Sequence, residues 1–275
     1  MSGSPRWLLR WSFARLEGPW AIPESPADFP VFLLLGQSNM AGHGGLRPDD
    51  PWQPGDHAPV AGVLVFGGQG TVKSSRPRGW CRWRPAAQPL HLNQRSAGFG
   101  LGLPFASKLL EDRRATRIGL IPGAWGGAGI DALGRGSPLY ENAVRRARIA
   151  ARRGHLAGVL WHQGETDAGC EVLAASHAAK LVRLIADLRG DLDCPHLPFL
   201  IGDLAPFGDE RREPEAVDRR ARVRAGLRQV AADDPHAAFV ESAGLAGCDS
   251  VHFSRAGLIE LGRRYAAAFQ APQAK

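Results

Sequence analysis

The sequence lacks any apolar run that approaches the roughly 18 residues of a membrane-spanning helix. Arginines interrupt the only apolar stretch near the N-terminus, which argues against a secretory signal peptide. The four cysteines lie far apart without C-x-x-C spacing, so neither a disulfide scaffold nor a zinc site is expected, although a single bridge stays open. These absences predict a cytoplasmic protein with no membrane partner.

Lysine is also scarce, since only four of the 34 basic residues are lysine, and the formal net charge is +7. A basic chain can bind nucleic acid. The arginines are spread over several predicted helices, however, and no helix-turn-helix, zinc-finger or RNP signature accompanies them. We therefore interpret them as solvated helix faces and expect no nucleic-acid partner. Nothing in the pattern predicts an oligomeric state.

Short apolar runs alternate with longer amphipathic stretches, which is typical of a parallel sheet covered by helices on both faces. The predicted strands are Val31–Leu35, Gly62–Phe66, Arg117–Ile121, Leu156–Trp161, Pro198–Ile201 and Ala237–Val240. The predicted helices are Gly102–Asp112, Leu139–Arg153, Glu171–Leu188, Glu213–Ala232 and Arg255–Phe269. We find no flexible linker and predict one domain over residues 1–275, with residues 1–29 as an extension that packs on it.

Polar residues follow several of these strands at the point where each strand ends. The first strand runs into Gly36-Gln37-Ser38-Asn39, the third into residues 122–131 and the fourth into residues 162–169, and residues 249–252 come near the C-terminus. In an open parallel sheet, ligands bind beyond the carboxyl ends of the strands. The convergence of hydroxyl, amide, acid and imidazole groups at this edge predicts a site.

Three of these residues could form a hydrolytic relay. A serine hydroxyl such as that of Ser38 becomes a good nucleophile only when a base takes its proton. His252 is a candidate base, and Asp249, three residues earlier, can reach its Nδ1–H and fix the tautomer. Taken singly, a serine after a strand is more often a helix cap, and an Asp–His pair beside the start of a helix, here capped by Ser254, more often lies on the surface.

Acyl transfer also needs hydrogen-bond donors where the oxyanion forms. The backbone N–H groups that follow the first strand, including that of Ser38, and those of Gly126 and Gly127 are candidates, as is the side-chain amide of Gln163. The alternatives are a plain strand-to-helix loop for the glycine pair and a buried structural amide for Gln163. Gln37, Asn39 and Trp125 lie beside these groups, and we predict that they contact substrate.

Four segments in this order resemble the SGNH hydrolase superfamily, and more narrowly the branch of sialate O-acetylesterases and family six carbohydrate acetylesterases. They are "LLLGQSNMAGHG", "IGLIPGAWGGAGID", "WHQGETDA" and "DSVHFSRAG". The resemblance covers Val31 to Phe269. It implies a three-layer α/β/α sandwich, flavodoxin-like, with about five mostly parallel strands, and it implies no metal and no cofactor.

The resemblance also implies roles for individual residues. Ser38 matches the nucleophile, His252 the general base and Asp249 the acid. The Gly126-Gly127 pair and Gln163 match the oxyanion hole, although the resemblance does not say which glycine donates. Glu165 matches an acid that orients the site or shares the duty of Asp249. Ala128 departs from the pattern, because a hydroxyl residue is expected there.

These matches predict a serine esterase that removes acetyl groups from carbohydrates such as acetylxylan or acetylated sialic acid. Two alternatives stay open: a short-chain lipid or thioester hydrolase with the same relay, and an inactive glycan-binding relative. Four tryptophans in or near the loops could stack on sugar rings or could equally anchor the loops by packing. They are Trp52, Trp80, Trp83 and Trp125.

Overall fold

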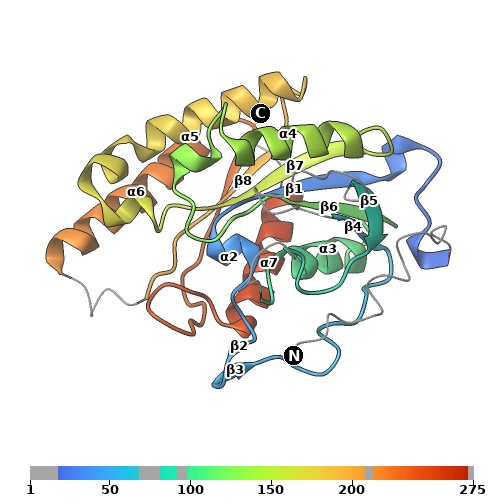
Figure 1. Cartoon of the computed structure of the whole chain (residues 1–275), viewed down its shortest axis with the longest axis horizontal. Helices are drawn as coiled ribbons and strands as arrows, with labels where there is room; N and C mark the ends of the chain where they lie inside the picture. The colour runs from blue at the N-terminus through green and yellow to red at the C-terminus, as the bar shows by residue number, and fades with distance from the viewer. Residues whose placement is uncertain (1–17, 68–80, 92–97, 208–212, 272–275) are drawn as a thin grey trace.

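A mixed sheet runs through the protein, with helices packed on both of its faces (Figure 1). The computed structural model describes residues 18–67, 81–91, 98–207 and 213–271. In the described residues the sheet has seven strands in the order β5-β4-β6-β1-β7-β8-β9. Their bounds are β1 Pro30–Gly36, β4 Val63–Gly67, β5 Arg82–Pro85, β6 Ile118–Pro122, β7 His155–His162, β8 Phe199–Gly202 and β9 Ala237–Val240. All six predicted strands are present.

Five of the strands form a flavodoxin-like core. Numbered along the chain, the parallel series β6-β1-β7-β8-β9 has the order 2-1-3-4-5 of that fold. The expected fold class is therefore confirmed. The sheet is larger than expected, because β4 adds a sixth parallel strand beside β6 and β5 pairs antiparallel with β4 at the edge. A hairpin of β2 (Leu46–Arg47) and β3 (Asp50–Pro51) lies outside this sheet.

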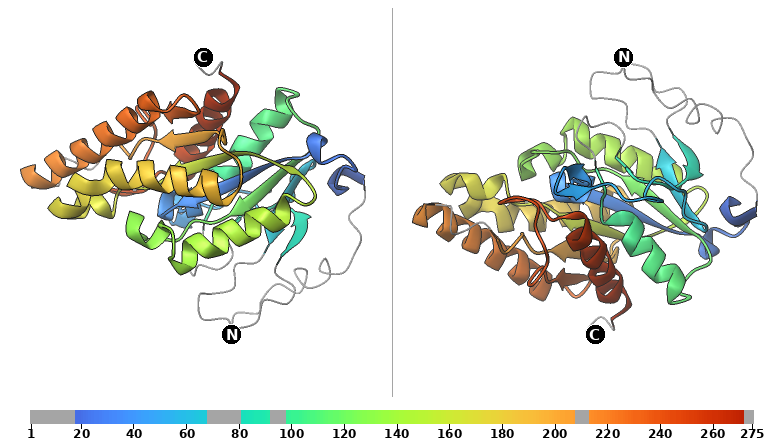
Figure 2. Two further views of the ribbon diagram at one scale, coloured as in Figure 1. Left: turned by 90° about the horizontal axis from the view of Figure 1, so that it is seen from above. Right: turned by 90° about the horizontal axis from the view of Figure 1, so that it is seen from below.

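Helices cover the sheet in two layers (Figure 2). On one face lie α4, α5 and α6, and on the other lie α3 and α7 (Figure 1). The bounds are α3 Gly102–Glu111, α4 Pro138–Ala150, α5 Glu171–Asp191, α6 Pro214–Asp233 and α7 Arg255–Gln270. The predicted helices therefore agree to within three residues at each end. A short helix, α2 (Ser38–Ala41), was not among the predicted elements, although a helix cap at Ser38 was left open. Ser38 is the first residue of this helix, and the N-cap position is Gln37.

The central strand β1 separates two apolar clusters, because successive side chains of a strand point to opposite faces. Val31, Leu33 and Leu35 pack in one cluster with residues of α4, α5 and α6, which we call the α4–α6 cluster. Phe32 and Leu34 pack in the other with residues of α3 and α7, which we call the α3–α7 cluster. Burial on both faces explains why this strand reads as a continuous apolar run.

The start of α7 has the predicted cap. The Ser254 hydroxyl accepts a hydrogen bond from the backbone N–H of Gly257 at 3.2 Å, which satisfies one of the free donors of the first turn. This cap matters for the site because His252 lies only two residues before it. The cap fixes where the preceding loop ends and the helix begins.

Other expectations from the sequence have mixed outcomes. All four cysteines are free thiols. Among the described residues, no helix is long and apolar enough to cross a membrane. Residues 1–17 lie outside the described part, so the packing of the whole N-terminal extension stays a prediction. The single domain also stays a prediction. In the described part of the extension, the carbonyl of Pro19 accepts a hydrogen bond from Gly62 N at 3.0 Å.

Gly36, at the end of β1, offers a stringent test of this packing. Its φ is +140°, and a Cβ there would lie 2.0 Å from the carbonyl oxygen of His162. Gly36→Ala should therefore destabilise the protein by about 3 kcal/mol or more, through overpacking added to backbone strain. Gly55 also has a positive φ, +91°, but a Cβ there meets no atom within 4 Å. Gly55→Ala should cost only about 1–2 kcal/mol. Equal losses in urea unfolding would contradict the close approach of β1 and β7.

Candidate active site

The loops singled out in the sequence meet at the carboxyl edge of the sheet because β1 lies between β6 and β7. Leu34 pairs with Pro122 of β6, and Gly36 pairs with His162 of β7. The backbone continues this pairing past the strand, since Gln37 N donates to His162 O at 3.0 Å. The turn that carries Ser38 is thereby held between the glycine loop after β6 and the loop after β7.

Ser38, His252 and Asp249 form a continuous chain of hydrogen bonds. Nε2 of His252 lies 3.0 Å from Oγ of Ser38, and Nδ1 lies 2.8 Å from Oδ2 of Asp249. The other carboxylate oxygen of Asp249 accepts the backbone N–H groups of Val251 and His252 at 2.8 and 2.7 Å. The aspartate is therefore fixed by its own loop and holds the imidazole with one nitrogen toward the serine.

The surroundings of Asp249 keep it ionised. Partial burial alone would raise its pKa, but the hydrogen bonds from the His252 ring and from the two backbone N–H groups hold the pKa at about 2. The guanidinium of Arg47 also approaches Oδ2 to 3.9 Å. A carboxylate that is charged at neutral pH can stabilise a positive charge on the neighbouring imidazole.

Asn39 joins the serine turn to the histidine loop. Its Nδ2 donates to the carbonyl of Val251 at 3.1 Å, and its Oδ1 accepts the N–H of Phe253 at 3.1 Å. These two groups flank His252 in the chain. Asn39 is fully buried, so the structure places this predicted substrate contact inside the protein, where it fixes the loop that presents the imidazole.

Glu165 supports Asn39 and makes no recorded contact with His252. Its Oε1 accepts a hydrogen bond from Asn39 Nδ2 at 2.6 Å and lies 3.8 Å from Nε2 of His162. The hydroxyl of Tyr265 donates to the carbonyl of Trp161 at 2.6 Å, so its oxygen is available to Nδ1 of His162 at 3.2 Å. We infer that His162 carries its proton on Nδ1. Burial lowers the pKa of this ring, which favours its neutral form.

Gln163 lies behind the site rather than in its wall. The side chain is fully buried. Its Nε2 donates to the carbonyl of Ala128 at 3.1 Å, to Oε1 of Gln37 at 3.2 Å and to a carboxylate oxygen of Asp167. Its Oε1 lies 2.9 Å from Nε2 of His177. Both ends of this amide therefore have protein partners, which is the structural alternative that the sequence left open.

Gln37 is the amide that reaches the site. Its Oε1 accepts hydrogen bonds from Gln163 Nε2 at 3.2 Å and from the backbone N–H of Thr166 at 3.3 Å. Because two donors fix the oxygen, the NH₂ end of the same amide points away from them. Gln37 lies next to Ser38 and lines the cavity described below. In the part of the chain that the structure describes, no acceptor is recorded for this NH₂ group.

A cavity of about 380 Å³ opens over Ser38. Its wall is formed by Gln37, Ser38, Ala41, Gly42, His43, Gly126, Gly127, Glu165, Thr166, Val251 and His252. Ser38, the glycine pair and His252 thus share the wall of one cavity. This volume is at the lower end of the about 300–1,000 Å³ that ligand pockets span.

The four tryptophans that could stack on sugar rings or anchor loops have different surroundings in the structure. Trp83 packs against Phe29 and Phe66 with ring centroids 4.8 and 4.9 Å away, so it anchors β5. Trp125 packs against the α4–α6 cluster and is not part of the cavity wall. Trp52 lies against His57 in the α3–α7 side of the molecule. Trp80 lies outside the described residues.

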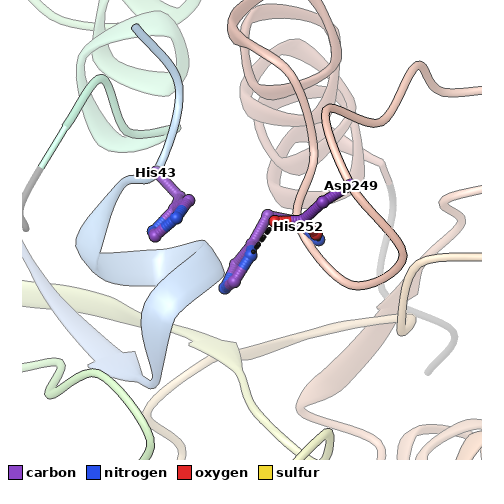
Figure 3. Close-up of side chains that lie close together, drawn as sticks. All are labelled: His43, Asp249 and His252. Atoms are coloured by element: carbon purple, nitrogen blue, oxygen red, sulfur yellow. Dashed lines mark hydrogen bonds and ion pairs between the residues drawn. The ribbon is translucent and has the colours of Figure 1, made fainter. Parts of the chain in front are cut away.

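A second imidazole, that of His43, lies against His252 (Figure 3). The two rings are stacked, with centroids 3.8 Å apart and planes 14° apart. Potential ligand atoms of His43, His252 and Asp249 all lie within 4.8 Å of one another. A metal ion must lie near the plane of each imidazole that binds it, and two parallel planes cannot share such a point. The geometry therefore fits a stack and does not fit a metal site.

The chain is similar to a known protein family over most of its length. Residues 28–271 match the family described as carbohydrate esterase, sialic acid-specific acetylesterase. The chain belongs to this family. It is therefore a carboxylic ester hydrolase, and the resemblance seen in the sequence is confirmed.

Known proteins are similar to this chain in sequence or in structure. A probable carbohydrate esterase of Arabidopsis thaliana is 32% identical over 266 residues, which cover 90% of this chain and 94% of that protein. The X-ray structure of the same Arabidopsis protein superimposes with a TM-score of 0.75 at 29% identity, over 90% of this chain and all of that one. NanS has a TM-score of 0.66 at 21% identity, over 89% and 97% of the two chains, and shows the shared fold.

Two polar residues of the cavity wall were not predicted from the sequence. His43 lies five positions after Ser38, and Thr166 directly follows Glu165. Both lie in segments that were recognised, and an imidazole or hydroxyl just after a strand end is a usable signal. Nothing local to the sequence indicates that His43 would stack on a ring more than 200 residues away.

The charge on Asp249 predicts a pH dependence of stability. Its pKa is about 2 in the folded protein, below the ordinary value of 3.8, so its contribution is present above about pH 4 and is lost as the pH falls from about 4 to 2. Asp249→Asn lacks this contribution. The difference in Tm between parent and variant should therefore be largest near neutral pH and shrink below about pH 4. A difference that stays constant down to about pH 3 would contradict the ionised, hydrogen-bonded aspartate.

Proposed function

We propose that the protein is a serine esterase that removes acetyl groups from carbohydrate hydroxyls through Ser38, His252 and Asp249. The observation that carries this proposal is the hydrogen-bonded chain from Asp249 through His252 to Ser38, which ends at the wall of the cavity. A purely glycan-binding protein gains nothing from such a relay, whereas hydrolysis through a serine nucleophile needs a base that takes the hydroxyl proton.

The proposed reaction has two halves. The Ser38 oxygen attacks the acetyl carbonyl while its proton passes to Nε2 of His252, and Asp249 stabilises the imidazolium. The C–O bond to the sugar then breaks, and the sugar oxygen takes the proton from His252. Water repeats the attack on the acetyl-Ser38 ester, again with His252 as base, and releases acetate and the free serine.

Three groups support the oxyanion in this proposal. Ser38, Gly126 and Gly127 line the cavity, and we assign two of the donors to the backbone N–H of Ser38 and to that of one residue of the Gly126-Gly127 pair. The side-chain donor is Gln37, because its NH₂ group faces away from the two donors that hold its oxygen. Gln163 acts indirectly in this proposal. Its NH₂ group already donates hydrogen bonds to Ala128 O and to Gln37 Oε1, and the second of these holds Gln37 in place.

The proposed roles of the two acids differ. Asp249 is the acid of the relay because it contacts the imidazole at 2.8 Å. Glu165 contacts Asn39 instead, and Asn39 holds both sides of the His252 loop. We therefore propose that Glu165 helps to align His252 through Asn39 and does not stabilise the positive charge that forms on His252.

The cavity and the family both support the proposed substrate class. The cavity is small, and amide, hydroxyl, carboxylate and imidazole groups contribute to its wall. Such a wall suits a short acyl group on a polar alcohol better than a long apolar chain. The family is described as sialic acid-specific acetylesterase, which supports an acetylated sialic acid first and other acetylated sugars, including acetylxylan, second.

Ser38→Ala provides the direct test. The variant should fold with an unchanged Tm, because among the described residues the hydroxyl has a hydrogen bond only with His252. It should lose at least about 10³-fold in kcat/KM. The assay compares acetate release from acetylated sialic acid, acetylated xylan, a short-chain lipid ester and a thioester. Faster turnover of the lipid ester or thioester than of both sugars would replace the proposed substrate. Equal turnover by parent and variant would exclude Ser38 as nucleophile.

Gln37→Glu and Gln163→Glu separate the two amides. Gln37→Glu replaces the proposed donor by an oxygen and should lower kcat by on the order of 10²–10³-fold with a smaller change in KM. Gln163→Glu should mainly lower Tm, because its new oxygen would face the acceptors of Ala128, Asp167 and Gln37. Full activity of Gln37→Glu, together with a stable but inactive Gln163→Glu, would make Gln163 the donor instead.

A further inference from the structure

His43 is a group of the cavity wall to which the relay assigns no task. Its ring lies face to face with that of His252 (Figure 3), whereas Asp249 and Ser38 contact the two ring nitrogens of His252. The two histidines come from opposite ends of the chain, one from the loop after α2 and the other from the loop before α7. Their contact is therefore a product of the fold and not of local sequence.

The backbone holds His43 in this position from both sides. Gly42 O accepts a hydrogen bond from Gly98 N at 2.8 Å, and Gly44 exchanges two hydrogen bonds with Phe99, at 3.2 and 2.7 Å. Gly42 has a φ of +102°, and a Cβ there would lie 2.5 Å from the carbonyl of Gly98. Residues 42–44 thus approach residues 98–99 as closely as glycines allow. This close approach holds the backbone of His43 where its ring can stack on His252.

The stack suits one protonation state of the base better than the other. Two neutral aromatic rings prefer an offset or edge-to-face arrangement over a parallel stack, because their faces are both negative. A cation over the face of a neutral ring is attracted to it. The arrangement of His43 and His252 therefore becomes more favourable when His252 gains a proton.

His43 is suited to remain the neutral partner. Burial lowers its pKa, and so do the nearby positive charges of His252 and Arg47, while Asp249 acts in the opposite direction. Asp249 and His252 belong to the loop before α7, and Arg47 belongs to β2. The net lowering of the pKa keeps His43 uncharged near neutral pH.

We propose that His43 is a positioning residue for the base: its ring holds the plane of His252 in line with Ser38 and Asp249, and its face stabilises the imidazolium that forms during acyl transfer. The inference rests on the proposed function. The proton still passes from Ser38 to Nε2 of His252 and onward to the leaving oxygen, and His43 neither takes nor gives one. An interaction that strengthens as the charge forms lowers the barrier without tightening substrate binding.

The test compares two substitutions of similar size. His43→Phe keeps a neutral aromatic face, whereas His43→Leu removes it. His43→Leu should lower kcat for an acetyl ester about tenfold with little change in KM, and His43→Phe should stay within about threefold of the parent. His155, an exposed ring at the far end of β7, serves as control, and His155→Leu and His155→Phe should match the parent. Equal kcat for His43→Phe and His43→Leu, at equal Tm, would overturn the inference.

A second measurement does not depend on turnover. NMR of the imidazole C–H groups should show those of His252 shifted upfield by the neighbouring ring in the parent and in His43→Phe, and shifted back downfield in His43→Leu. An unchanged His252 shift in His43→Leu would exclude the stack. If the parent hydrolyses no ester at all, the proposed function fails, and the ring shift alone then decides whether His43 positions His252.

Discussion

The alignment of this site depends on the side-chain amide of Asn39. Its two ends bind the backbone on both sides of His252, and Glu165 holds it from behind. One buried amide thus ties the turn after the first strand to a loop more than 200 residues away. A buried amide that lost any of these partners would leave a polar group unsatisfied, which costs about 1–3 kcal/mol. The penalty for separation keeps the serine and the imidazole within hydrogen-bond distance.

A second layer of buried polar groups lies beneath this contact and has a different task. Gln163 is satisfied on both ends and fixes the amide of Gln37, which faces the cavity. The protein therefore has one amide, that of Gln37, that lines the cavity and another, that of Gln163, that orients it. Such division is expected where groups must be held within a fraction of an ångström before a charge develops.

The sequence allowed the scaffold to be predicted because the relevant signals are local. Strands buried on both faces read as apolar runs, and Asp249 had to lie near His252 because only two residues separate them. The edge strand Arg82–Pro85 was missed, since two arginines and a proline conceal it. The partners of Asn39 and Gln163 depend on which loops meet in space, and so does the stack of His43 on His252. An amide in a motif has the same appearance whether it faces a ligand or the interior.

The division of the interior into two apolar clusters has a consequence for how the enzyme fails. Ala128 and Ala168, in the glycine loop and the loop after β7, pack in the α4–α6 cluster, whereas Met40 and Phe253, beside Ser38 and His252, pack in the α3–α7 cluster. Ser38 and His252 and the loops around them are thus anchored in separate layers on the two faces of the sheet. Loosening of either layer would shift one set of cavity residues against the other. We therefore expect heating to abolish activity at or below the temperature at which the fold is lost.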